Sequence, residues 1–483
     1  MNTKKLFIQT IGCQMNVYDS EKIVDLLKPM GYQPSDTLAE ADLVVLNTCA
    51  IREKAAQKAF SFLGRLTELK RRNPGMIIAV GGCVAQQEGR GILKRVPLLD
   101  IVFGTQAVGR LPGMIRRVAS NRCRIVDVEM TPDIAEFEIP DADRQRGSIS
   151  RFVTIMQGCD NFCTYCVVPH VRGREASRRP EQILREIRAL VDAGVREVTL
   201  LGQNVNSYGK KEGLIPFHEL LSGINDIDGL WRIRFTTSHP KDLSPELMEA
   251  FRSLGKLCPH IHLPVQSGSD AVLKRMHRRY TRGTYLEKVD RLRAIRPDIA
   301  ITSDIIVGFP GETRADFEET LDLVRAVGFD GLFAFMYSDR PNAPAAGFAD
   351  KVADMEKAAR LQVLLSLQEN QTLLQNRALE GTVQEVLVDG PSRRHGGADA
   401  EMPDAGGDAF EKDAPRAVLQ WGGRTPGNKI VHFTLPDDDC APAGDITGER
   451  ILVRIEDAFC HSLRGRPVPA GTRRLKGETC HAA

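Results

Sequence analysis

The chain has 483 residues, of which 42% are hydrophobic and 27% are charged, a composition that is ordinary for a globular protein of two or three domains. Its formal charge of +2 excludes a strongly basic or acidic protein, so any contact with nucleic acid must come from local clusters of charge. No stretch approaches the ~20 apolar residues of a membrane helix, and the apolar run near the start is too short for a signal peptide, so we expect a cytoplasmic protein without a membrane partner.

The chain contains 11 cysteines, an odd number. Disulfide scaffolds are typical of short secreted domains. In a long chain without a secretory signal, cysteines that stand in motifs more often bind metals or act in catalysis.

Residues 1–120 alternate short apolar runs with amphipathic helical patterns. This alternation is typical of a parallel sheet with helices on both faces, and we predict a flavodoxin-like α/β domain. The predicted strands are 6–10, 43–46, 76–80 and 101–103, and the predicted helices are 18–30 and 52–72. The first three strands each lead to a cysteine, namely Cys13, Cys49 and Cys83, at intervals of about one βαβ unit. Ligands bind at the carboxyl ends of such strands, so we expect the three thiols to meet in one crevice.

Residues 145–375 repeat a strand–helix pattern after a polar stretch, 121–144, which we interpret as a linker. Six such units predict a partial (βα)6 TIM-like barrel with its functional loops at the carboxyl ends of the strands. The predicted strands are 152–156, 197–201, 233–236, 261–265, 299–307 and 332–336, with helical patterns such as 180–193 and 314–327 between them.

The last part of the chain changes from helix to strand. A helical pattern over 350–379 leads to strand patterns at 383–388, 417–420, 430–435 and 451–455, which predict a small C-terminal β-barrel within 376–470. The insert 390–416 is rich in Gly, Ala, Asp and Pro, and we predict a mobile loop there. Residues 471–483 form a basic tail.

The most specific motif is C-x3-C-x2-C, formed by Cys159, Cys163 and Cys166 directly after the first predicted barrel strand. Three thiolates on one loop can hold three corners of a cubane iron–sulfur cluster and leave the fourth iron open. Zinc prefers four ligands, and no fourth ligand lies nearby in the sequence. The alternative, three structural cysteines, is disfavoured by this spacing at a barrel mouth.

This motif at the first strand of a partial βα barrel resembles the radical S-adenosylmethionine superfamily. The resemblance implies that the open iron of a 4Fe–4S cluster binds S-adenosylmethionine, whose reductive cleavage gives a 5′-deoxyadenosyl radical. The three upstream cysteines and the downstream β domain are similar to the methylthiotransferase family within it. That resemblance implies an auxiliary 4Fe–4S cluster on Cys13, Cys49 and Cys83, for which buried structural thiols are the alternative. It also implies two S-adenosylmethionine molecules per turnover, one as radical source and one as methyl donor.

Three short sequences, at 12–16, 202–206 and 237–240, resemble the branch of this family that acts on isopentenylated adenosine in tRNA. The resemblance implies methylthiolation of C2 of N(6)-dimethylallyladenosine beside the anticodon, and a TRAM-like RNA-binding role for the C-terminal barrel. A single-stranded loop base can be splayed into a barrel mouth with little unpairing. One alternative is a methylthiotransferase that acts on threonylcarbamoyl-adenosine or on a ribosomal-protein aspartate. Another is an iron–sulfur RNA-binding or electron-carrying protein, but electron carriers usually close all four cluster corners with cysteine.

The remaining candidate residues lie at strand ends and on the cluster loop, where glycines let the backbone approach a ligand. We predict S-adenosylmethionine contacts from Tyr165, Gln203, Asn204, Ser238, Gln266, Ser267, Gly308, Phe309 and Gly311. We predict RNA contacts, with a solvated surface as the alternative, from Arg172, Arg174, Arg178, Arg179, Arg278 and Arg279.

The implied partners are a tRNA substrate, an electron donor such as flavodoxin or ferredoxin, and a sulfur donor or cluster-repair protein. We expect a monomer. The pairs Cys460-His461 and Cys480-His481 resemble metal ligands, but such pairs near chain ends are common by chance.

Overall fold

The computed structural model describes residues 3–50, 53–131, 148–392, 420–435 and 444–468. The chain divides into two compact units, one formed by Met1–Gly328 with Leu332–Leu365 and the other by Phe329–Gly331 with Ser366–Ala483. Residues 393–416 of the predicted insert, and the whole predicted tail 471–483, lie outside the described residues. Of the described helices, none combines the length and the apolar character that crossing a bilayer requires.

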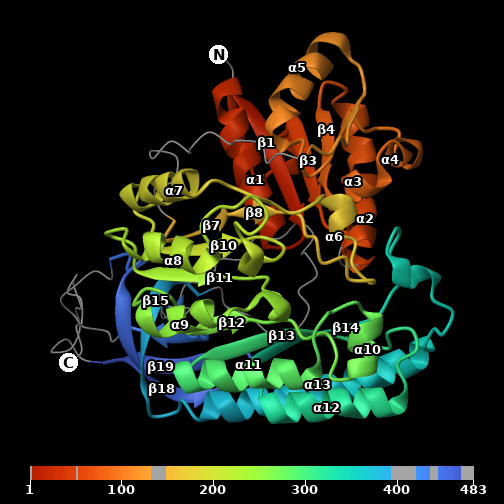
Figure 1. Ribbon diagram of the computed structural model, residues 1–483. Coiled ribbons are helices and arrows are strands. Elements are labelled where there is room, and N and C mark those ends of the chain that lie inside the picture. Colours follow the sequence, from red (N-terminus) through yellow and green to blue (C-terminus); the bar gives the residue numbers. More distant parts are fainter. Residues whose placement is uncertain (1–2, 51–52, 132–147, 393–419, 436–443, 469–483) are drawn as a thin grey trace, which may run out of the picture. The chain divides into compact units, whose positions relative to one another are not determined.

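The first unit begins with a six-stranded parallel sheet in the order β2-β1-β3-β4-β5-β6. Its strands are β1 (Lys4–Ile11), β2 (Tyr32–Pro34), β3 (Leu43–Thr48), β4 (Ile77–Gly82), β5 (Ile101–Phe103) and β6 (Ile125–Asp127). Its helices are α1 (Gln14–Leu27), α2 (Glu53–Arg72), α3 (Cys83–Glu88), α4 (Gly91–Arg95) and α5 (Leu111–Asn121). Successive side chains of a strand point to opposite faces, so Leu43 and Val45 pack with α1 and α5, while Val44 and Leu46 pack with α2. Helices therefore cover both faces of the sheet, as predicted (Figure 1).

Two strands of this sheet go beyond the predicted set. β2 ends in Pro34 at the edge of the sheet, where a missing amide donor is tolerated. β6 lies inside the stretch 121–144 that was interpreted as a linker, and it pairs with β5. Each strand has 3 residues, and unlike the predicted strand 101–103 each includes a polar residue and is buried at only one of its three positions, so no apolar run marks it. The sheet therefore extends into the predicted linker.

The rest of the first unit contains a second set of strands and helices that alternate along the chain. β7, β10 and β11 form a parallel sheet, and β12, β13 and β14 form another sheet. A parallel bridge pairs Ile233 of β11 with Leu257, which lies just before β12 in the chain. The strands are β7 (Ser150–Thr154), β10 (Glu197–Leu201), β11 (Arg232–Phe235), β12 (His260–His262), β13 (Ala300–Val307) and β14 (Gly331–Met336). The helices are α7 (Pro180–Asp192), α8 (Phe217–Asn225), α9 (Pro245–Ser253), α10 (Asp270–Arg275), α11 (Arg282–Ile295) and α12 (Arg314–Val327). The predicted partial (βα)6 barrel is confirmed.

A long loop follows the first barrel strand and contains the C-x3-C-x2-C motif. Two short strands, β8 (Met156–Gln157) and β9 (Ala176–Ser177), pair antiparallel and bring the two ends of this loop together. The short helix α6 (Val168–Val171) lies within it. Strands of two residues leave no periodic pattern in a sequence, so this closure could not be predicted.

The second unit contains a closed barrel in the order β15-β16-β17-β19-β18, preceded in the chain by α13 (Asp354–Arg377). The strands are β15 (Val383–Pro391), β16 (Gln420–Arg424), β17 (Ile430–Thr434), β18 (Arg450–Ala458) and β19 (Leu463–Pro467). Val386, Trp421, Phe433 and Ile455 are among the residues of its core. The predicted C-terminal β-barrel is confirmed, and β19 is a strand that the sequence analysis did not predict.

Candidate functional site

Three cysteines meet at one edge of the N-terminal sheet. The parallel strands β1, β3 and β4 are in register, so that Ile11 pairs with Thr48 and Thr48 pairs with Gly82. Each of these three residues is followed within two positions by a cysteine. The three cysteines are Cys13, Cys49 and Cys83. The carboxyl ends of parallel strands are where α/β sheets bind ligands, so the register gathers three thiols at a ligand-binding edge.

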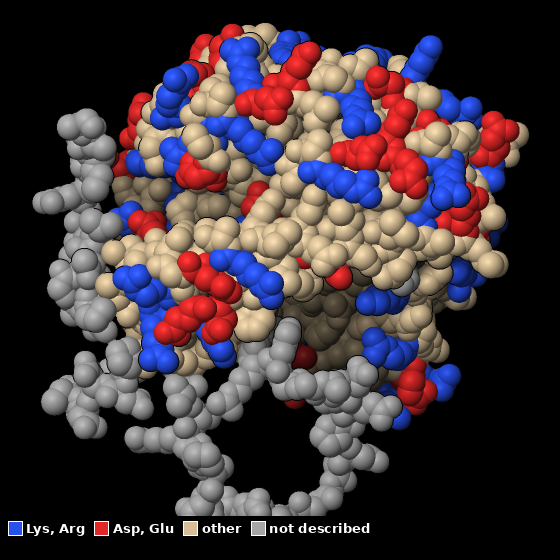
Figure 2. All heavy atoms as spheres, turned by 90° about the horizontal axis from the view of Figure 1, so that it is seen from below, with Lys and Arg blue, Asp and Glu red and all other residues tan. Residues whose placement is uncertain are grey.

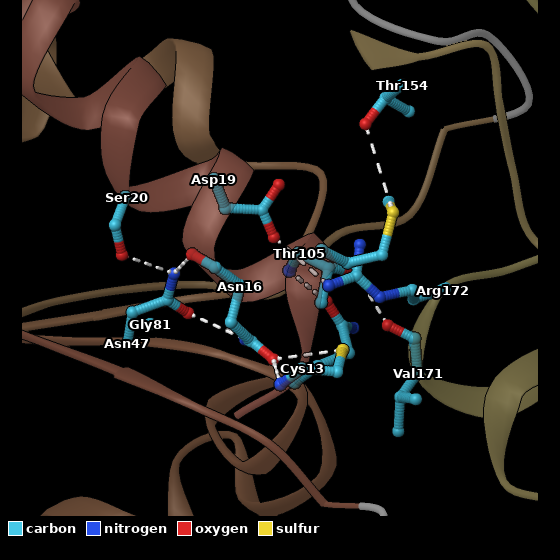
Figure 3. A network of polar contacts seen from close by, with 12 residues as sticks. Cys13, Asn16, Asp19, Ser20, Asn47, Gly81, Thr105, Thr154, Val171 and Arg172 are labelled. Atoms are coloured by element: carbon cyan, nitrogen blue, oxygen red, sulfur yellow. Dashed lines mark hydrogen bonds and ion pairs between the residues drawn. The ribbon is translucent and has the colours of Figure 1, made fainter. Parts of the chain in front are cut away.

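A buried amide network shapes the turn that holds Cys13 (Figure 3). Asn16 is fully buried, and its Oδ1 accepts a hydrogen bond from the Cys13 backbone N–H at 3.2 Å. Its Nδ2 donates to Asn47 Oδ1 at 3.0 Å and to the Thr48 carbonyl oxygen at 3.1 Å. Asn47 donates in return to the Asn16 carbonyl oxygen at 2.9 Å. The network therefore links the Cys13 turn to the end of β3, which leads to Cys49.

Two glycines allow these strand ends to approach each other closely. A Cβ on Gly12 would lie 2.1 Å from Asn16 Oδ1. Gly82 has a φ of +88°, and a Cβ there would lie 2.3 Å from the Thr48 carbonyl oxygen. Each glycine directly precedes a cysteine, so a larger residue would displace the cysteine or the network beside it.

Arg172 brings positive charge to this cysteine edge. Its Nη2 lies 3.0 Å from Asp19 Oδ2, and the two side chains are 4% and 7% exposed. Nη1 of the same guanidinium is buried and has no hydrogen-bond partner among the described residues. A hydrogen bond with Cys49 lowers the pKa of Cys13 to about 5, and the Arg172 charge acts in the same direction. Burial raises the pKa of Cys83, an effect that the Arg172 charge opposes.

The second set of cysteines lies on the loop between β8 and β9. The Cys159 amide donates to the Gly173 carbonyl oxygen at 3.3 Å, across the loop, and the Cys166 amide donates to the Cys163 carbonyl oxygen at 3.0 Å. Gly158 has a φ of +73°, and a Cβ there would lie 2.0 Å from a backbone oxygen of the returning segment. The backbone that presents the three thiols is therefore held on both sides of the loop.

Arg278 lies buried against this loop. Its Nη1 is 3.6 Å from Cys163 Sγ and 3.4 Å from Tyr165 Oη, while its Nη2 donates to the Pro264 carbonyl oxygen at 2.6 Å. These contacts fix the guanidinium between the cluster loop and the segment that follows β12.

Burial acts against ionisation at the other two thiols of the loop. It raises the pKa of Cys159 to about 11 and that of Cys166 to about 12. Thiols with such high pKa values stay protonated near neutral pH unless a positively charged group replaces the proton. A bound metal supplies that charge, because a coordinating thiol is deprotonated outright.

Unpaired polar atoms gather where β10 and β11 end. Among the described residues, Asn204 Oδ1, both amide atoms of Asn206, Ser238 Oγ and His239 Nε2 are buried without a hydrogen-bond partner. Buried polar atoms are almost always paired, so a group of unpaired ones indicates a site for a polar ligand. β10 and β11 are neighbouring parallel strands, which places these atoms at the same end of the barrel.

The tautomer of His239 follows from its surroundings. Its Nδ1 accepts the Lys241 backbone N–H at 3.2 Å, so the neutral ring carries its proton on Nε2. Burial lowers the pKa of His239 strongly, and the charge of Arg278 acts in the same direction. The ring therefore carries a buried, neutral N–H donor.

Four other predicted cofactor residues form bonds within the protein. Gln203 Oε1 accepts the Gly158 amide at 2.6 Å, which ties the end of β10 to the cluster loop. Ser267 Oγ lies 3.3 Å from Thr320 Oγ1. Gln266 is buried with a φ of +78°, a strained conformation for a residue with a side chain, and Tyr165 contacts Arg278.

The turn after β13 contains the last three predicted cofactor residues. Gly308 and Gly311 have φ values of +68° and +81°, so the turn requires glycine at both positions. The Phe309 ring is fully buried and packs edge-to-face on Tyr337, with ring centroids 5.3 Å apart. The side chain of Phe309 is therefore part of the core, and its carbonyl oxygen accepts the Glu312 amide at 2.9 Å.

The sequence of the chain matches two protein families and many curated proteins. It matches the Radical SAM superfamily over residues 153–324 and a family described as Uncharacterized protein family UPF0004 over residues 5–104. It is 56% identical over 464 residues to the tRNA-2-methylthio-N(6)-dimethylallyladenosine synthase of Desulfosudis oleivorans, covering 96% of both chains. The synthase of Syntrophus aciditrophicus is 50% identical over 469 residues, covering 96% of this chain and 95% of that one. The chain belongs to the tRNA-2-methylthio-N(6)-dimethylallyladenosine synthase family.

A solved structure shares the fold of this synthase-family chain. The radical S-adenosylmethionine methyltransferase TsrM from Kitasatospora setae, with cobalamin and a [4Fe-4S] cluster bound, aligns with a TM-score of 0.52 at 14% identity. The alignment covers 72% of this chain and 77% of TsrM.

Each of the two donor sets in the synthase-family chain consists of three thiols, the ligand type of iron–sulfur clusters. In the part of the chain that the structure describes, no three His, Cys, Asp or Glu side chains lie close enough to surround one ion. In a cubane each cysteine binds a different iron, so the three sulfurs lie farther apart than the ligands of one ion. The unpaired Arg172 Nη1 also fits an anionic cluster at the N-terminal edge. Cys480 and His481 of the suggested tail site lie outside the described residues.

The structure revises the predicted RNA contacts. The side chains of Arg172, Arg178 and Arg278 are 10% exposed or less, and Arg178 is paired with Glu186 at 2.8 Å. Burial and contacts with protein atoms disfavour a phosphate contact for these three guanidinium groups. The exposed candidates are Arg174, Arg179 and Arg279. On the face shown in Figure 2, basic and acidic side chains are interspersed, which agrees with the balanced overall charge.

Sequence reasoning missed three buried residues beside the predicted ones. Asn206 and His239 stand in motifs that the analysis noted, but only their unpaired buried atoms set them apart. Glu175 is 7% exposed, and burial raises its pKa to about 7. No sequence signal distinguishes a buried carboxylate from a surface one, because glutamate is usually exposed.

Proposed function

We propose that this protein transfers a methylthio group to C2 of N(6)-dimethylallyladenosine beside the anticodon of tRNA. The observation that carries the proposal is the presence of two separate three-cysteine sets in a chain whose near-full-length relatives carry the corresponding synthase name. A set that supplies three thiolates leaves one iron of a cubane for another ligand. Two such sets suit a reaction in which one centre serves the radical chemistry and the other serves the sulfur.

The residues that would hold the groups follow from the two donor sets. Cys159, Cys163 and Cys166 would hold one 4Fe–4S cluster, and Cys13, Cys49 and Cys83 would hold the auxiliary one. When bound, the first cluster and S-adenosylmethionine supply the radical, and a second S-adenosylmethionine supplies the methyl group. Arg278 beside Cys163, and Arg172 at the auxiliary edge, place fixed positive charge next to the thiolates.

The polar atoms at the ends of β10 and β11 would orient S-adenosylmethionine or the adenine. His239 Nε2–H is a donor, Asn204 Oδ1 is an acceptor, and Asn206 offers both. The turns at Gln266-Ser267 and Gly308–Gly311, whose backbone has positive φ at Gln266, Gly308 and Gly311, would line the same site. Enclosure of these atoms would also keep water from the reacting carbon.

The tRNA would reach the barrel mouth along the exposed rim of the cluster loop. Phe162 is 39% exposed there, Arg174 lies over its ring at 5.2 Å, and the His277 ring lies 3.1 Å from its carbonyl oxygen. An exposed aromatic ring beside an arginine, here one that also pairs with Asp160, suits an unstacked base. Arg179 and Arg279 would add phosphate contacts.

The remaining assignments rest on the family. Residues 1–120 would carry the auxiliary cluster, 145–375 the radical chemistry, and 376–470 further RNA binding. A flavodoxin or ferredoxin would supply electrons, and a sulfur donor or cluster-repair protein would restore the sulfur. We place the enzyme in the cytoplasm because its substrate is a tRNA, and we expect it to act as a monomer.

The experiment that tests this function separates the two centres. Anaerobically reconstituted protein should hold about eight irons, and the Cys159, Cys163 and Cys166→Ala variant should hold about four. Cys163→Ala should abolish S-adenosylmethionine cleavage, whereas Cys49→Ala should still cleave it and yield no methylthio product. A triple variant that retains the full iron content, or equal loss of cleavage in the two single variants, would refute the division into two centres.

A further inference from the structure

Arg172 belongs to the cluster loop of the barrel, but its surroundings belong to the N-terminal sheet. The Thr105 hydroxyl donates to the Val171 carbonyl oxygen at 2.7 Å, and Gln106 Nε2 lies 3.4 Å from the Arg172 carbonyl oxygen. The side chain reaches Asp19 on α1, as Figure 3 shows. Arg172 of the barrel is therefore fixed by two segments of the N-terminal α/β domain, the turn after β5 and helix α1.

The same segment packs directly against a cysteine of the N-terminal set. Cys83 shares an apolar cluster with Val167, which precedes α6, and with Val171, the last residue of α6. Arg172 follows Val171, so its guanidinium enters the cysteine edge from the α6 side. A side-chain hydrogen bond joins Arg172 to Cys83.

The hydrogen bonds of this guanidinium are incomplete. Arginine carries five N–H donors, and Asp19 accepts from Nη2. Nη1 is buried and has no partner among the described residues, in a protein interior where such donors are almost always paired. The Arg172 side chain also forms a hydrogen bond with Cys83, so its unpaired Nη1 lies at the cysteine edge, where a bound ligand would pair it.

We propose that Arg172 is a positioning residue for the auxiliary cluster, with Nη1 donating a charge-assisted hydrogen bond to an anionic sulfur of that cluster. The inference rests on the proposed function, because it requires a cluster at Cys13, Cys49 and Cys83. Hydrogen bonds to sulfur and nearby positive charge both favour the reduced, more negative state of an iron–sulfur cluster. Arg172 therefore raises the reduction potential of the auxiliary cluster.

A purely structural role would be the neutralisation of Asp19. The variant Asp19→Asn with Arg172→Gln separates the two roles, since an amide pair can replace the ion pair without leaving a charge unpartnered. Arg110→Gln with Asp127→Asn is a matched control in the same sheet, where the exposed Arg110 pairs with Asp127 at 2.6 Å. Arg172→Lys keeps the charge but loses the forked donor.

The test uses the full chain with Cys159, Cys163 and Cys166 changed to Ala, so that only the auxiliary cluster is bound. Iron is counted, the reduction midpoint is measured by a redox titration followed by electron paramagnetic resonance, and melting of the iron-free chain reports folding. A charge-assisted hydrogen bond changes an equilibrium by about tenfold or more. The double variant should therefore bind about four irons, melt near the parent temperature, and be reduced at a midpoint lower by about 59 mV or more.

The control pair should leave the midpoint unchanged, and Arg172→Lys should give a smaller shift than the double variant. A double variant with the parent midpoint would overturn the role of Arg172 while leaving the cluster assignment intact. A parent that binds no iron would overturn the auxiliary cluster itself, and with it the proposed function.

Discussion

Asn16→Ala should both destabilise the first compact unit and prevent iron binding at the N-terminal cysteine edge. The Asn16 side chain satisfies three buried groups, namely the Cys13 amide, Asn47 Oδ1 and the Thr48 carbonyl oxygen. A buried polar group left without a partner lowers stability by about 1–3 kcal/mol. The three together should lower the free energy of unfolding by at least about 3 kcal/mol. The turn at Cys13 should then separate from the end of β3, so the reconstituted protein should hold about four irons instead of about eight.

Urea denaturation of the iron-free chain measures the first effect, and iron analysis after reconstitution measures the second. Asn376→Ala is the matched control, because Asn376 is a buried asparagine of the second unit that donates to the Phe459 carbonyl oxygen at 2.7 Å. It should lower stability and leave the iron content unchanged. If the free energy of unfolding of Asn16→Ala lies within about 1 kcal/mol of the wild-type value and the variant keeps all its iron, the network does not hold the cysteine edge.

Three further predictions concern charge and the exposed loop. Glu186→Gln leaves the buried Lys22 and Arg178 without their carboxylate and should lower the free energy of unfolding, measured in urea, by about 3–5 kcal/mol. Asp322→Asn, in the exposed pair with Arg325, should change the free energy of unfolding by less than about 1 kcal/mol. Equal effects of the two variants would contradict the role of burial. Burial raises the pKa of Glu175 from 4.5 to about 7, so between these pH values the folded chain keeps a proton that the unfolded chain releases. The free energy of unfolding should therefore fall as the pH rises from 4.5 to about 7. Denaturation curves recorded at the two ends of this pH range should show no such fall for Glu175→Gln. Phe162→Ala should weaken tRNA binding roughly tenfold in fluorescence anisotropy, from the loss of about 1–3 kcal/mol of base stacking, and an unchanged Kd would exclude this surface.

The cysteine edge could be predicted because its signals are local. Each of β1, β3 and β4 contains a run of apolar residues and is followed within two positions by a cysteine, and parallel strands separated by single helices must end at the same edge. β2 and β6 could not be predicted, because each has only 3 residues and, unlike the wholly apolar β5, includes a polar residue. β19 was not predicted for a different reason. Arg464 and Arg466 alternate with the buried residues of this strand, so the sequence contains no apolar run that would indicate a strand.

The buried arginines could not be predicted, because burial of a charge depends on partners that are distant in the sequence. Arg172 is 153 positions from Asp19, and Arg278 is 115 positions from Cys163. A run of basic residues usually indicates a solvated surface, and only the fold shows which member of the run enters the protein. The unpaired atoms of Asn206 and His239 are likewise a property of the packed barrel.

The central claim is the transfer of a methylthio group to a dimethylallyl-bearing adenosine. The measurement that tests it most directly compares two tRNAs that differ only in that group, under reducing, anaerobic conditions, with the 2-methylthio nucleoside detected by mass spectrometry. Enclosure of five carbons, at ~0.8 kcal/mol each, gives up to ~4 kcal/mol and roughly a thousandfold preference for the dimethylallyl substrate. We predict product from that tRNA and essentially none from the other. Equal turnover of the unmodified tRNA, or product only from a threonylcarbamoyl-adenosine tRNA, would contradict the proposed substrate.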